Sequence, residues 1–134
     1  MFRYSICDPF EDAPIEMGEI EKEKIMEVLG KFPWMELYDK TIGRESEIHY
    51  SPSLEFENKT NGHSVIASLD DRKTDKAFSI FYIRPKVINR LMSWINQEPQ
   101  NVESERREQS IIDVHAAVEA LVNEDYTTLA KRWG

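Results

Sequence analysis

Apolar and polar residues alternate in the middle of the chain, and this pattern predicts an antiparallel sheet. Two alternating segments, 54–60 and 63–69, stand on either side of Asn61-Gly62. Asn and Gly tolerate the positive φ angles that a two-residue type I′ turn requires. We therefore predict a β-hairpin centred on this pair.

The same turn predicts the register of the hairpin and the face on which each side chain lies. Counting outward from the turn places Leu54 opposite Leu69, with the apolar residues at alternate positions on the same face. Glu55 and Glu57 fall on the other face, and Glu57 is opposite Ile66. One face of the hairpin is thus expected in the core and the other mostly in solvent.

Further strands are predicted on both sides of the hairpin. Segment 77–84 has apolar residues on both of its faces, which is typical of a strand in the middle of a sheet. Segment 47–51 alternates as well. Segment 34–38 fits a short strand or a continued turn. Segment 1–14 fits an extended arm, and the alternation near its start leaves an edge strand open.

Helical spacing of apolar residues predicts one helix before the sheet and two or three after it. Segment 15–31 carries an apolar stripe with charged residues on its other side. Segments 85–95 and 111–122 carry similar stripes, and a last short helix is expected over 126–133. Segment 97–107 is polar and has no period, so we predict an internal loop or linker there.

This order of elements places the chain in the α+β class. We predict an antiparallel sheet of three to five strands, preceded by one helix and followed by two or three helices packed mainly on one face. Short turns between strands disfavour a parallel sheet, which needs longer crossovers. A length of 134 residues suits one domain, 1–134, with a core that needs no disulfide or metal.

Composition and charge indicate the cellular compartment and the class of binding partner. The single Cys7 has no second cysteine to pair with, no apolar run approaches 18 residues, and the first residues lack the pattern of a signal peptide. We therefore expect a cytoplasmic protein without a membrane segment. A net charge of −8 disfavours nucleic acid as a partner and favours a basic protein. Arg106 and Arg107 do not change this, because glutamates surround them.

Candidate chemistry is sparse. Clustered carboxylates with an imidazole can bind a metal or act as acid and base, and Glu47, His49, Glu55 and Glu57 are the best such set. Carboxylates at alternate positions are, however, typical of the polar face of a strand. The three histidines and Cys7 lack the close spacing of zinc motifs. We predict no catalytic residue, metal or cofactor, and favour a protein that is not an enzyme.

Three segments together resemble small bacterial proteins of the toxin-immunity type. They are EIHYSPSLEF at 47–56, Asn61-Gly62, and FSIFYIRPK at 78–86. The resemblance rests on a strand pattern over about the central third of the chain, and no binding residues transfer with it. It implies a small acidic α+β protein that masks a toxin by binding it.

We therefore expect a protein-binding module, of the immunity type, that contacts a basic toxin through an acidic sheet face. The expected contact residues are Glu47, His49, Glu55, Glu57, Asp70 and Asp71. An alternative is a small ligand-binding domain or enzyme with a pocket between sheet and helices, lined by Trp34, Tyr50, Phe81 and Trp94. A third interpretation is a homodimer: if no helix covers the second sheet face, Ile66, Phe81 and Ile83 form an apolar patch there. The chain is thus expected to be a monomer or a homodimer.

Overall fold

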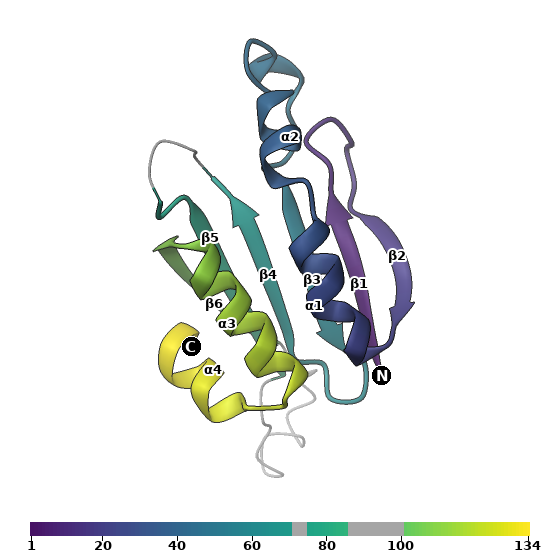
Figure 1. Ribbon diagram of the computed structural model, residues 1–134, viewed down its shortest axis with the longest axis vertical. Coiled ribbons are helices and arrows are strands. Elements are labelled where there is room, and N and C mark those ends of the chain that lie inside the picture. Colours follow the sequence, from purple (N-terminus) through teal and green to yellow (C-terminus); the bar gives the residue numbers. More distant parts are fainter. Residues whose placement is uncertain (71–74, 86–100) are drawn as a thin grey trace, which may run out of the picture.

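The computed structural model describes residues 1–70, 75–85 and 101–134. Within these residues the chain has an α+β fold, with a six-stranded antiparallel sheet and four α-helices (Figure 1). The α+β class and the antiparallel sheet are confirmed, but the sheet has more strands than the three to five predicted.

The strands follow the order β2-β1-β3-β4-β5-β6 across the sheet. Strands β3 to β6 are neighbours both in sequence and in space, whereas β1 lies between β2 and β3. The strands are β1 Phe2–Cys7, β2 Ile15–Ile20, β3 Ser53–Asn58, β4 Ser64–Leu69, β5 Phe78–Pro85 and β6 Asn101–Gln109. The helices are α1 Lys22–Lys31, α2 Trp34–Asp39, α3 Ile111–Val122 and α4 Tyr126–Trp133, with a 3-10 turn at Glu45–Glu47.

The core lies between one face of the sheet and the helices. Figure 1 shows α1 and α3 across the same face of the sheet, with α4 beside β5 and β6. Every second side chain of the central strands points into this layer, as the period of a strand requires. The core includes Ile25, Leu29, Val114, Leu121 and Trp133 from helices and Leu54, Phe56, Val65, Ile80 and Tyr82 from strands.

The central hairpin is confirmed, but its predicted register is wrong by two residues. The Asn58 N–H donates to the His63 carbonyl at 2.8 Å, so the loop spans residues 59–62 instead of two residues. Gly62, at φ 79°, takes the left-handed conformation that this longer loop needs. Leu54 therefore pairs with Ala67, not Leu69. A shift of two leaves each side chain on its predicted face.

The first helix prediction is wrong in its N-terminal half. Residues 15–20 form β2, and only 22–31 form a helix. Gly18, at φ 93°, is incompatible with a right-handed helix, and β2 pairs along β1. The segment predicted as an extended arm with a possible edge strand, 1–14, does contain a strand, β1, but β1 is not at the sheet edge because β3 pairs with its other side.

Three further segments also differ from their predictions. Residues 47–51 form no strand: Glu47 ends the 3-10 turn and 48–51 follow it, while 34–38 belong to α2. Residues 101–107 of the predicted linker belong to β6, which forms because its backbone pairs with β5. The predicted strand at 77–84 and the helices at 111–122 and 126–133 are confirmed. Nearly all of the helix predicted at 85–95 and the rest of the linker lie outside the described residues.

Candidate binding face

One face of the sheet is free of every helix that the structure describes, and we call it the open face. Antiparallel partners point to the same side of a sheet, so the register gives the rows of side chains that cross it. One row consists of Ser5, Glu55, Ile66, Phe81 and Glu105. The next row consists of Arg3, Glu57, Ser64, Ile83 and Glu103.

An apolar stripe runs through the centre of the open face. Ile66, Phe81 and Ile83 are half-buried neighbours on β4 and β5. Carboxylates border the stripe on both sides: Glu55 and Glu57 on β3, and Glu103 and Glu105 on β6. The three residues of the predicted apolar patch therefore lie side by side, between two acidic strands.

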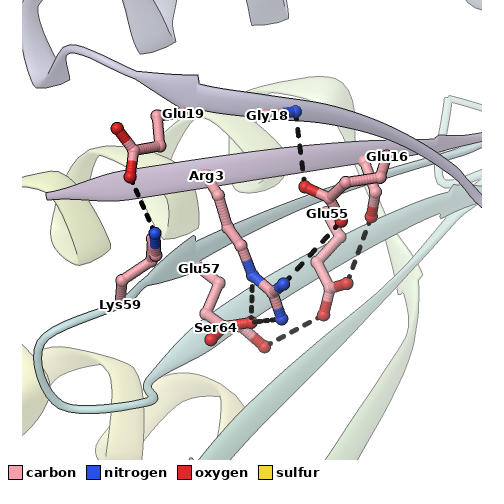
Figure 2. Close-up of polar contacts among 9 residues, drawn as sticks. Arg3, Glu16, Gly18, Glu19, Glu55, Glu57, Lys59 and Ser64 are labelled. Atoms are coloured by element: carbon pink, nitrogen blue, oxygen red, sulfur yellow. Dashed lines mark hydrogen bonds and ion pairs between the residues drawn. The ribbon is translucent and has the colours of Figure 1, made fainter.

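Basic side chains neutralise part of the acidic side formed by β1, β2 and β3 (Figure 2). Arg3 donates from Nε and Nη2 to Glu57 Oε2, at 3.0 and 2.6 Å, and its Nη1 lies 3.8 Å from Glu16 Oε2. Lys59 Nζ lies 2.8 Å from Glu19 Oε1. These pairs are partly exposed to solvent, so each contributes little to stability.

Glu55 differs from these carboxylates in its partners. The Ser64 hydroxyl donates to one of its oxygens at 3.3 Å (Figure 2), and the Ser5 hydroxyl donates to the other at 3.3 Å. Glu55 makes no ion pair with any residue in the described part of the chain. Burial raises the pKa of the Glu55 carboxyl, and the two serine hydrogen bonds offset part of that effect. The open face thus holds a half-buried carboxylate beside its apolar stripe.

The six predicted contact residues do not form one patch. Glu55 and Glu57 lie on the open face, and Glu57 is near the hairpin end of β3. Glu47 and His49 lie beyond the other end of β3, where Glu47 pairs with Arg44 at 2.9 Å. The His49 N–H donates to the Pro9 carbonyl at 2.8 Å. Strand alternation does not extend to Glu47 and His49, because they precede β3 and belong to no strand.

The remaining two predicted contact residues follow β4. Asp70 lies at the same end of the sheet as His49, and its carboxylate accepts a hydrogen bond from Ser79. It borders an open hollow of about 680 Å³ that Ser79, Glu105 and Arg107 also line. The hollow adjoins an irregularity in the pairing of β5 with β6, next to Glu108 at φ 57°. Asp71 lies outside the described residues.

The described residues of the predicted alternative pocket lie in different parts of the structure and do not line a common cavity. Trp34 packs edge-on against Phe78 at 5.0 Å between ring centroids, within the core. Phe81 points to the open face, because it lies between the core residues Ile80 and Tyr82 on β5. The Tyr50 hydroxyl donates to the Asp12 carbonyl, away from both. Trp94 lies outside the described residues.

A group of polar and aromatic side chains around His63 joins the hairpin loop to α4. The sequence analysis did not predict it. His63 Nδ1 lies 2.8 Å from Tyr82 Oη, and the His63 ring stacks on Tyr126 at 4.0 Å. Asn61 Nδ2 donates to the same Tyr126 hydroxyl. Burial and the positive charge of Arg84 lower the pKa of His63. The available signal was the position of His63 directly after the turn and next to a core strand.

Comparison with known proteins found no similar protein: no family, no curated protein and no solved structure matches this chain. Among the described residues, no helix is long and apolar enough to cross a membrane. Within the same ranges, no group of three or more His, Cys, Asp or Glu side chains is placed to hold a metal ion.

Proposed function

We propose that the protein is a non-enzymatic binding module of the immunity type, which neutralises a basic protein toxin through its open face. The observation that carries this proposal is the apolar stripe of Ile66, Phe81 and Ile83 between two acidic strands, on the face that the described helices leave free. A contact surface with an apolar centre and charged sides has the anatomy of protein interfaces.

Electrostatics favour a basic partner for this face. Six glutamates on strands border the stripe or extend its rows, against the described cations Arg3, Lys59 and Arg107 that pair with some of them, and the whole chain carries a net charge of −8. Opposite charge on a partner raises the rate of encounter and discriminates against acidic proteins. The six are Glu16, Glu19, Glu55, Glu57, Glu103 and Glu105.

The test is co-expression of this protein with the product of the adjacent reading frame, followed by binding kinetics. A toxic neighbour that becomes harmless in combination supports the proposal. Glu57→Lys together with Glu103→Lys, one on each side of the stripe, should then lower the association rate about tenfold at low salt. The matched control is Glu23→Lys with Glu119→Lys, which changes the net charge equally on exposed positions of α1 and α3.

Two results would contradict the proposal. If the neighbour is equally harmful with and without this protein, the neutralising role is lost. If the control pair slows association as much as the open-face pair, the open face is not the contact surface, because only the overall charge then matters. Circular dichroism of both double variants checks that the fold is retained.

A further inference from the structure

We infer that Glu55 is the position on the open face that receives an arginine or lysine side chain of the partner. The inference rests on the proposed function and adds the chemistry of the contact. It stands on three properties of Glu55: its place beside the apolar stripe, its partial burial, and the lack of an ion pair with any described residue.

The neighbouring carboxylates show what sets Glu55 apart. Glu103 has no ion pair with a described residue but is exposed, unlike the half-buried Glu55. Glu57 already accepts two hydrogen bonds from Arg3, Glu19 pairs with Lys59, and Glu105 pairs with Arg107. A cation from a partner would have to displace those side chains. Glu55 accepts only from the Ser5 and Ser64 hydroxyls among described residues, and Arg3, which is hydrogen-bonded to Glu57, acts on its charge without bonding to it.

The serine hydrogen bonds also leave room for a further donor. Each Glu55 oxygen accepts one serine hydroxyl, and a carboxylate oxygen has a second lone pair. A guanidinium can donate to both oxygens at once, which is the stronger form of a charged hydrogen bond. The serines hold the carboxylate in place, so little side-chain entropy is lost when the cation binds.

The surroundings of Glu55 fit the stem of a long basic side chain. Ile66 is directly opposite Glu55 on β4, and Phe81 is the next residue in the same row. The methylene groups of arginine or lysine can cover such apolar surface while the charged end reaches the carboxylate. The occupant is thus a segment of a partner in which a basic residue is flanked by apolar residues.

The experiment uses two synthetic peptides with the full-length protein. One is the acetylated and amidated pentapeptide Val-Arg-Val-Arg-Val, and the other replaces each arginine by citrulline, which keeps the shape and removes the charge. Binding is followed by the backbone amide resonances of Glu55, Ile66 and Phe81 during titration. The variants are Glu55→Gln, Glu55→Asp and, as a control on the exposed side of α3, Glu119→Gln.

We expect the arginine peptide to bind the wild type and to shift these three amides. Citrulline in the peptide, or Glu55→Gln in the protein, should each weaken binding about tenfold or more, which is typical of losing a charged hydrogen bond. Glu55→Asp keeps the charge and should fall between Glu55→Gln and the wild type. Glu119→Gln should bind as the wild type does.

Failure of the inference can be told apart from failure of the proposed function. If the arginine peptide shifts the three amides equally in the wild type and in Glu55→Gln, Glu55 does not receive the cation, although the open face still binds. If the arginine peptide shifts none of them, the inference is also wrong. The co-expression result stands apart from both outcomes, because it depends on neutralisation and not on one side chain.

Discussion

The ionised Glu55 carboxyl destabilises the folded protein, and this cost in the free energy of unfolding can be measured without a partner. Because burial raises its pKa, the folded state binds a proton there more tightly than the unfolded state does. The free energy of unfolding therefore decreases as the pH rises through the raised pKa. Below the ordinary pKa of about 4.5, the carboxyl is neutral in both states and the cost is absent.

From this we predict that Glu55→Gln stabilises the protein at pH 7. The expected gain is about 0.5 kcal/mol, since the half-buried site is still partly screened by solvent. The gain should disappear below pH 4.5. Urea denaturation at the two pH values measures it, with Glu57→Gln as the comparison, because that change breaks the pair with Arg3 and should give no gain. An equal effect at both pH values would contradict the prediction.

His63 is the second residue with a predictable effect of pH. Its pKa is lowered by burial and by Arg84, so the unfolded state binds a proton there more readily than the folded state. Stability from this group is present above the ordinary pKa of 6.5 and is lost as the pH falls below it. His63→Gln should remove that part of the slope, a few tenths of a kcal/mol between pH 7 and pH 5, in urea denaturation.

A control separates the charge of His63 from its hydrogen bond. Tyr82→Phe removes the 2.8 Å contact with Nδ1 and should cost about 1 kcal/mol at pH 7. It leaves the imidazole free to titrate, so a slope between pH 7 and pH 5 should persist in this variant. If His63→Gln has the same slope as the wild type, another group is responsible for it.

Several residues of the open face could be assigned to it from the sequence, but Arg3 could not. Alternation placed Glu55, Glu57, Ile66 and Phe81 on one face correctly, because a strand period of two follows from sequence alone. Arg3 was missed because its segment was interpreted as an extended arm without a defined partner strand. The alternation of Phe2, Tyr4 and Ile6 was visible, but the partner strand that holds Arg3 beside Glu57 lies 54 residues away.

At the scale of elements, two glycines should respond in opposite directions to alanine. Gly30 lies inside α1, where the described residues leave open space for an alanine Cβ, so Gly30→Ala should stabilise the protein by about 0.5–1 kcal/mol. Gly62 ends the hairpin loop at φ 79°, where alanine is strained, so Gly62→Ala should cost about 1–2 kcal/mol. Thermal unfolding compares the two variants, and a stabilising Gly62→Ala would contradict the loop conformation described above.

Elements with a clear apolar period were predictable, and elements decided by distant pairing were not. The strand at 77–84 and the helix at 111–122 carry their own buried faces. Strand β2 carries mostly exposed residues, two of them acidic, so its sequence resembled a helix surface. Only pairing with β1 makes it a strand. Strand β6 is similar, because its polar sequence gains order from β5. Such edge strands depend on contacts that local patterns do not contain.

At the scale of the whole molecule, the two faces of the sheet have different roles in the proposal. The helices bury one face and supply the stable core. On the open face, the apolar residues in the centre favour association, and the acidic residues on both sides determine which partner binds. The same charges that attract a basic protein repel a second copy of this chain. The homodimer interpretation of the apolar stripe is therefore the weaker one.

We therefore expect the protein to be a monomer whose self-association depends on salt. A two-fold dimer through Phe81 and Ile83 would bring the acids bordering the stripe in both copies close together. Sedimentation at micromolar concentration should thus give the monomer mass at low ionic strength. At about 1 M salt, where the screening length falls to about 3 Å, any dimer through the stripe should increase. Phe81→Ala should abolish that increase, while Ile112→Ala, on exposed α3, should not. A dimer that is already complete at low salt would mean that the stripe binds a second copy in spite of its charges.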